Sequence, residues 1–185
     1  MNNRAGAVPF VFVRHGQTET NVRGLLAGST DVALTDQGIR EAELAADLLT
    51  DTDIGIICSS PLQRARRTAE VTAARHALPV TIIDELRERN WGELEGKAFP
   101  SDLGNPQPPG GESLDDYVSR VDRALTRFFR MAPDGHGLLV AHAGTFDAMC
   151  RLFGIRNGAA VIGNARPIRF DPPEKPGAPW HIASI

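Results

Sequence analysis

The sequence predicts a protein of the α/β class, because short apolar segments alternate with amphipathic segments of helical length. The apolar segments lie at 8–13, 54–58 and 138–141, and their β-branched, aliphatic and aromatic residues are typical of buried strands. The intervening segments carry apolar residues at helical spacing. A chain of 185 residues can bury a substantial core in one domain. We therefore expect a single domain over 1–185.

The first helix is expected between the first two of these strands. Thr35 and Asp36 suit its N-terminus, and it should extend to about Leu49. Apolar residues recur at helical spacing and should form one face of this helix. They are Ile39, Ala42, Ala46 and Leu49.

A second helix should follow the strand at 54–58. Ser60 suits its N-cap and Pro61 its first position, where the N–H that proline lacks would have no helical acceptor. The helix is expected over 61–75, and a further strand over 79–83.

An irregular, lid-like insertion is expected around 97–112, which is rich in proline. Ser113 then begins a helix with a capping-box-like pattern, in which a carboxylate takes the place of the usual Glu or Gln. We interpret the apolar stripe of this helix as core: Leu114, Tyr117, Val118, Val121, Leu125, Phe128 and Phe129.

The C-terminal part of the chain should complete the sheet. A helix through about Phe153 is expected after the strand at 138–141. The segments 167–170 and 180–185 are expected to be edge strands.

The composition indicates a globular protein that acts on small molecules. Hydrophobic residues make up 42% of the chain, charged residues 23%, and the net charge is −3 with dispersed arginines, which argues against nucleic acid as a partner. No membrane-spanning or signal-peptide segment is evident. Cys58 and Cys150 are expected to be free thiols in a reducing compartment. We expect a cytoplasmic protein without a membrane partner, and the oligomeric state stays open.

Polar residues follow the strands where ligands bind in α/β sheets. Arg14 and His15 follow the first strand, Arg64 the second and His142 the third, while 86–96 forms a charged loop. A guanidinium group fits phosphate oxygens, and an imidazole can attack phosphorus. Together these groups indicate phosphoryl transfer.

These motifs, in this order, resemble the histidine phosphatase superfamily, the phosphoglycerate mutase-like family with the RHG motif, over nearly the whole chain. Their segments are 14–21, 59–65, 86–88 and 140–144. The resemblance suggests branch 2 of the superfamily. It implies a three-layer α/β/α sandwich with a mostly parallel central sheet, in a single histidine phosphatase domain.

The resemblance also implies roles for individual residues. His15 would be the nucleophile and Glu88 the proton donor. The phosphate-binding groups would be Arg14, Asn21, Arg64, His142 and the backbone N–H of Ala143. Two positions depart from the family pattern: Ala143 replaces a glycine but keeps its N–H, and Asp147 stands where a cation is more common, which leaves the substrate open.

Physical chemistry favours the same roles. Two arginines supply fixed positive charge for a phosphate, and they disfavour a positive charge on His15, so that one ring nitrogen stays free to attack. The other histidines have no metal-ligand spacing. We therefore expect neither a metal nor another cofactor. The predicted reaction is a two-step hydrolysis of a small-metabolite phosphate ester through a phosphohistidine.

The sequence also offers other candidates for the nucleophile and for the proton donor. Cys58 and Arg64 have the C-x5-R spacing of cysteine-dependent phosphatases, but the segment between them lacks glycine, and Pro61 removes an N–H donor. Glu93 or Glu95 could replace Glu88 as the acid.

Alternatives for the function also exist. A phosphoglycerate mutase-type enzyme would return the phosphoryl group to its substrate, but the mutases of the family carry an arginine pair in a longer insertion, where this chain offers only Lys97 between Arg89 and Arg120. A phosphoprotein phosphatase is disfavoured by the presence of Glu88. A silent phosphate-binding module is disfavoured because every catalytic position is filled.

Overall fold

The computed structural model describes residues 8–98, 107–132, 134–156, 162–175 and 177–185. It contains a six-stranded sheet in the order β3-β2-β4-β1-β5-β6. The strands are β1 (Phe10–Arg14), β2 (Ile56–Ser59), β3 (Val80–Ile82), β4 (Gly137–Ala141), β5 (Pro167–Asp171) and β6 (His181–Ser184). The first four pair in parallel, whereas β5 and β6 are antiparallel to their neighbours. The sheet is therefore mixed and mostly parallel, as expected.

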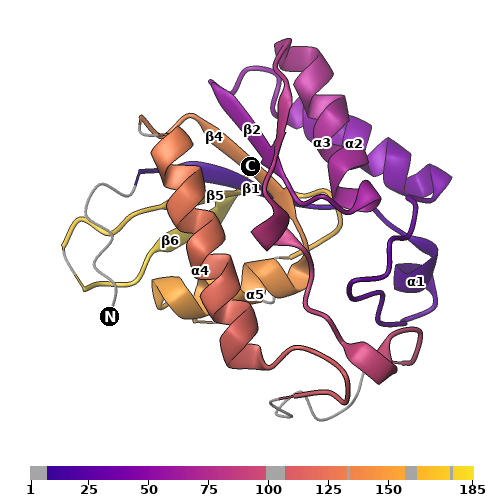
Figure 1. The fold of residues 1–185 in the computed structure, drawn as a ribbon. Helices are drawn as coiled ribbons and strands as arrows, with labels where there is room; N and C mark the ends of the chain where they lie inside the picture. Colours follow the sequence, from indigo (N-terminus) through magenta and orange to yellow (C-terminus); the bar gives the residue numbers. More distant parts are fainter. Residues whose placement is uncertain (1–7, 99–106, 133, 157–161, 176) are drawn as a thin grey trace.

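Helices cover both faces of this sheet (Figure 1). They are α1 (Glu19–Val22), α2 (Asp36–Leu48), α3 (Gln63–His76), α4 (Leu114–Met131) and α5 (Ala143–Phe153). Alternate residues of β1 face opposite cores: Phe10 and Phe12 pack in the core with α4 and α5, and Val11 and Val13 in the core with α2 and α3. This period of two places one helical layer on each face. The predicted three-layer α/β/α sandwich is confirmed.

Two predicted helices begin directly after the capping residues that the sequence indicated. Thr35 Oγ1 accepts a hydrogen bond from the N–H of Gly38 at 3.0 Å in α2. In α4, Ser113 Oγ accepts from the N–H of Asp116 at 3.0 Å and donates to its carboxylate at 2.7 Å. These side chains satisfy N–H groups that a helix leaves without acceptors.

The predicted start of α3 is wrong by two residues. The helix begins at Gln63, and its N-cap is Leu62, which makes no side-chain capping bond. Ser60 Oγ instead accepts from the N–H of Leu62 at 3.3 Å and lies 2.8 Å from the ring of His142. Ser60 is therefore a neighbour of His142 rather than a helix cap, and Arg64 still lies in the first turn.

Two further expectations need correction. β5 is not an edge strand, because it pairs with both β1 and β6. Ile39 does not pack on the sheet, since it is 44% exposed while Ala42 and Ala46 are buried. The short helix α1 was not predicted; its capping box joins Thr18 and Asn21.

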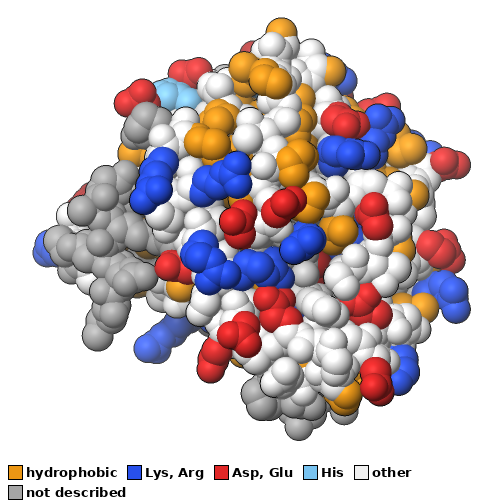
Figure 2. Space-filling model, in the orientation of Figure 1, with side chains coloured by type: hydrophobic (Ala, Val, Ile, Leu, Met, Phe, Trp, Pro, Cys, Tyr) orange, Lys and Arg blue, Asp and Glu red, His pale blue; other side chains and the backbone are white. Residues whose placement is uncertain are grey.

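Two other expectations are only partly covered by the structure. Half of the predicted insertion at 97–112 falls on 99–106, outside the described residues, and the lid-like insertion stays a prediction. None of the described helices is long and apolar enough to cross a membrane. Figure 2 shows acidic and basic side chains interspersed over the displayed face.

Candidate active site

His15 lies directly after β1, at the end of the sheet where β1, β2 and β4 finish. Its Nδ1 is 2.7 Å from the carbonyl oxygen of Gly16. A carbonyl only accepts, so Nδ1 carries the ring proton, and the lone pair lies on Nε2. Burial, followed by the charges of Arg64 and Arg14, holds the pKa of His15 well below its usual value. The ring is therefore a neutral imidazole with Nε2 available to attack.

His142 lies directly after β4 and is the N-cap residue of α5. Its ring centroid is 5.3 Å from that of His15. Its Nε2 is 2.8 Å from Ser60 Oγ. Ser60 Oγ accepts from the N–H of Leu62, and its hydroxyl proton is free to be donated to Nε2; in that arrangement the ring proton of His142 lies on Nδ1. Burial, with the charge of Arg64 next, holds the pKa of His142 well below its usual value.

Arg64 is a fully buried arginine at the N-terminal end of α3, with 1% of its surface exposed. Its Nη1 and Nη2 donate to the carbonyl oxygens of Thr30 at 2.9 Å and Gly28 at 2.8 Å. Arg14 is the half-buried last residue of β1. Burial lowers the pKa of both groups, but a guanidinium does not deprotonate in proteins. The site thus holds two fixed cations.

Several buried donors of this site have no partner among the described residues. They are Arg14 Nε, Arg64 Nε and His142 Nδ1. Buried donors without partners are costly. Because two of these donors belong to the two cations themselves, they indicate that the site is built for an anion with several acceptor oxygens.

Glu88 reaches the same site from the loop after β3. Its Oε1 accepts from the hydroxyl of Tyr117 at 2.9 Å and from the N–H of Arg89 at 2.8 Å, and its Oε2 accepts from the N–H of Gly144 at 3.0 Å. A Cβ atom at position 144 would lie 2.2 Å from Glu88 Oε1. Glycine is therefore needed there for the carboxylate to approach α5.

Arg120 of α4 holds the backbone of this loop. Its Nη1 donates to the carbonyl oxygens of Glu85 and Arg87, both at 2.8 Å. Its Nη2 forms an ion pair with Glu112 at 2.6 Å, and both side chains are largely buried. Since Glu88 follows these carbonyl groups directly, Arg120 fixes the position from which Glu88 enters the site.

Asn21 and Ala143 also border the site. Asn21 Oδ1 accepts from the N–H of Thr18 at 3.1 Å and from Asn164 Nδ2 at 3.3 Å, and Asn164 Nδ2 also donates to the carbonyl of His15 at 2.9 Å. The Asn21 amide is thus linked to the backbone of His15. Ala143 is the first residue of α5, where backbone N–H groups lack helical acceptors and the helix dipole attracts anions.

The alternative catalytic groups lie in unsuitable surroundings. Cys58 belongs to the apolar core on the α4 and α5 side, and burial raises the pKa of its thiol to about 12, so it is not a thiolate at neutral pH. Glu93 is exposed. The carboxylate of Glu95 accepts hydrogen bonds from the N–H groups of Ser29 and Thr30. Asp147 forms an exposed ion pair with Arg151.

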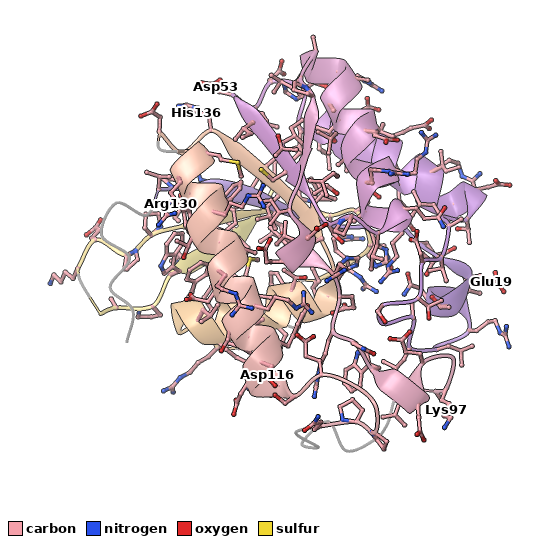
Figure 3. The ribbon with its side chains drawn as sticks, in the orientation of Figure 1. Glu19, Asp53, Lys97, Asp116, Arg130 and His136 are labelled. Atoms are coloured by element: carbon pink, nitrogen blue, oxygen red, sulfur yellow. The ribbon has the colours of Figure 1, made fainter. Side chains whose placement is uncertain are left out.

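Other titratable residues lie away from this site or form no metal cluster. His136 pairs with Asp53 at 3.0 Å, where the chain enters β2 and β4 rather than where these strands end (Figure 3). In the ranges that the structure describes, no group of three or more His, Cys, Asp or Glu side chains could hold a metal ion.

Several site residues were missed by the sequence analysis. Tyr117 was interpreted only as core, yet its hydroxyl binds Glu88 and lies 3.1 Å from Thr145 Oγ1. Ser60 was interpreted as a cap, and Asn164 was not considered. The hydroxyl of a buried tyrosine usually has a hydrogen-bond partner. The presence of a tyrosine in an otherwise apolar stripe could therefore have indicated a polar contact at Tyr117.

Comparison with known proteins gives consistent matches. The model of the histidine phosphatase superfamily (branch 1) matches residues 10–161, so the expectation of branch 2 is wrong. An uncharacterized phosphatase of Bacillus subtilis is 32% identical over 144 residues, covering 74% of this chain and 72% of the relative. An adenosylcobalamin/alpha-ribazole phosphatase of Salmonella typhimurium is 30% identical over 151 residues, covering 74% and 75%. A mycobacterial glucosyl-3-phosphoglycerate phosphatase, solved with VO3, has a TM-score of 0.80 at 28% identity, covering 95% of this chain and 97% of that one.

Proposed function

The chain belongs to branch 1 of the histidine phosphatase superfamily, and on that premise we propose that it hydrolyses small-metabolite phosphate esters through a phosphohistidine at His15. The observation that carries the proposal is the set of buried donors without partners in the described part of the chain, Arg14 Nε, Arg64 Nε and His142 Nδ1. They border a neutral imidazole. A phosphate oxyanion would satisfy these donors, and Nε2 of His15 could attack its phosphorus.

In the proposed first step, Nε2 of His15 attacks phosphorus and the ester P–O bond breaks. The departing alkoxide takes a proton from Glu88. Oε1 of Glu88 accepts two hydrogen bonds, from Tyr117 and Arg89. Oε2 accepts one hydrogen bond, from Gly144. The transferred proton is therefore assigned to Oε2.

In the proposed second step, water attacks the phosphohistidine and the P–N bond breaks. Glu88, now a carboxylate, accepts the proton of the water, and inorganic phosphate leaves. Arg14 and Arg64 stabilise the charge on the phosphoryl oxygens in both steps. Because these fixed cations supply that stabilisation, a chelator should leave the rate unchanged.

Hydrolysis is favoured over phosphoglycerate mutase-type transfer. Lys97, the cation available in the expected insertion, is exposed and lies at the outer end of the acid loop in Figure 3. It is not placed to clamp a substrate in the site between the two steps. An acid at Glu88 is needed most for esters with poor leaving groups, which favours alkyl phosphates over aryl phosphates such as phosphotyrosine.

The substrate is addressed by a phosphate-release screen. The panel should include alpha-ribazole phosphate and glucosyl-3-phosphoglycerate, on which similar proteins are named to act, together with sugar phosphates, phosphoglycerates and phosphoserine. We expect phosphate release from at least one alkyl ester, and none after His15→Asn. Conversion of a phosphoglycerate to its isomer without phosphate release would instead support a mutase.

Cytoplasmic location stays a prediction, supported by the free buried thiols of Cys58 and Cys150.

A further inference from the structure

The carboxylate of Glu95 accepts five hydrogen bonds from described residues. Its Oε1 accepts from Ser29 N–H at 2.7 Å, from the Ser29 hydroxyl at 2.8 Å and from Trp91 N–H at 3.2 Å. Its Oε2 accepts from Thr30 N–H at 3.0 Å and from the Thr30 hydroxyl. A single carboxylate therefore fixes both the backbone and the side chains of residues 29–30.

The same segment holds Arg64 from its other side. The carbonyl oxygens of Gly28 and Thr30 accept hydrogen bonds from the two terminal nitrogens of the Arg64 guanidinium. The peptide group that joins Gly28 to Ser29 thus donates its N–H to Glu95 and accepts from Arg64 with its C=O. A carboxylate on the N–H side polarises the peptide group and strengthens the bond at its carbonyl.

Gly28 shows that the chain is shaped for this contact. Its φ of +52° favours glycine, and a Cβ atom there would lie 2.2 Å from Glu95 Oε1. The backbone can approach the carboxylate only without a side chain. Leu26 adds a second link, because its N–H donates to the carbonyl of Lys97 and its carbonyl accepts from Gly96.

We propose that Glu95 is a positioning residue, which fixes segment 28–30 so that its carbonyl groups hold Arg64 in the phosphate pocket. Because Glu88 and Glu95 share one loop, this contact also ties the acid to the phosphate-binding arginine. The inference rests on the proposed function of Arg64.

The electrostatics of Glu95 agree with this role. Burial raises the pKa of its carboxyl group, but hydrogen bonds from Thr30 and Ser29 outweigh that effect, and the net pKa lies below the usual value. Glu95 is therefore ionised at neutral pH. Its charge also favours the cationic form of Arg64.

A double-mutant cycle tests the coupling. Glu95→Gln and Arg64→Lys should be prepared singly and together, with inorganic phosphate as the competing ligand in an assay with p-nitrophenyl phosphate. Each single change should weaken phosphate binding about tenfold or more: Arg64→Lys removes hydrogen-bond donors from the phosphate pocket, and Glu95→Gln loosens the carbonyl groups that position Arg64. The double variant should be little weaker than Arg64→Lys alone, because Glu95 acts through Arg64. Glu93→Gln, an exposed carboxylate on the same loop, is the matched control and should bind phosphate normally.

A second, less disruptive variant keeps the test decisive if Glu95→Gln fails to fold. Thr30→Val removes one hydroxyl donor but keeps the backbone N–H, and it should give a smaller loss of phosphate affinity that disappears in the Arg64→Lys background. Losses that simply multiply in both cycles would overturn the positioning role while leaving the proposed function intact. A normal phosphate affinity in Arg64→Lys would instead overturn the proposed phosphate pocket itself.

Discussion

The hydroxyl of Tyr117 donates a hydrogen bond to Glu88 Oε1 over a distance of 2.9 Å. Burial, with the charge of Glu88 next, holds the pKa of Tyr117 well above its usual value, so the phenol keeps its proton. With Thr145 Oγ1 at 3.1 Å from the same hydroxyl and Gly144 N–H bound to Oε2, α4 and α5 together orient the carboxyl group of the proposed acid. This arrangement leads to the first prediction.

Tyr117→Phe should remove one donor to Glu88 while keeping the aromatic ring in the core. The hydroxyl would stabilise the carboxylate that Glu88 becomes as its proton leaves, and a hydrogen bond to a charged group is typically worth about 1.5–3 kcal/mol. We therefore expect hydrolysis of an alkyl phosphate to slow by about tenfold or more. Steady-state rates with alkyl and aryl esters are the measurement. If both esters slowed equally, the hydroxyl would stabilise the fold rather than orient the acid.

Glu88→Gln should separate substrates by their leaving groups. The amide cannot supply a proton, and general acid catalysis is typically worth about 10²–10⁴-fold. Hydrolysis of alkyl phosphates should fall by roughly this factor, whereas the burst of p-nitrophenolate, a good leaving group, should persist. Burst kinetics isolate the phosphorylation step from the later hydrolysis. Equal losses for both esters in that step would assign Glu88 a binding role.

Cys58→Ala should leave catalysis intact. The thiol lies in the apolar core, and burial raises its pKa to about 12, so its removal costs packing alone. We expect a loss of about 1 kcal/mol in the free energy of unfolding, measured with urea, and an unchanged kcat. Abolished phosphate release from a folded Cys58→Ala protein would revive the cysteine mechanism.

The stability of the ligand-free protein should depend on pH through His15 and His142. The pKa of each is held well below the usual value in the folded state, so the unfolded chain binds protons that the folded protein does not. The contribution of the two neutral rings to the free energy of unfolding is complete above about pH 6.5 and is lost as the pH falls. The free energy of unfolding should then change with a slope of up to about 1.4 kcal/mol per pH unit for each histidine. Urea unfolding between pH 7 and 5 in phosphate-free buffer measures this slope.

His142→Asn should reduce that slope by about half, because one of the two buried histidines is gone. A free energy of unfolding that stays constant over this range would contradict the buried, neutral state of both rings.

Local sequence patterns predicted much of the fold and part of the site. β1, its last residue Arg14 and the following His15 could be predicted because they are neighbours along the chain. The start of α4 at Ser113 could be predicted for the same reason, since a cap bonds within one helical turn.

Contacts between distant segments could not be predicted in this way. Arg64 is held by carbonyl groups at Gly28 and Thr30, and Tyr117 meets Glu88 from another helix. The local sequence around these residues does not predict either contact, because the contacts depend on the order of the strands in the sheet and on the packing of the helices. The position of β5 between β1 and β6 is likewise set by pairing across the sheet.

The phosphohistidine at His15 is tested most directly by trapping it during turnover. The protein should be mixed with p-nitrophenyl phosphate, denatured within milliseconds at alkaline pH and mapped by mass spectrometry, with Glu88→Gln used to slow the second step. We predict a phosphoryl group on His15 that is lost in acid and kept in alkali. A phosphoryl group on Cys58, or phosphate release by His15→Asn at the normal rate, would contradict the account.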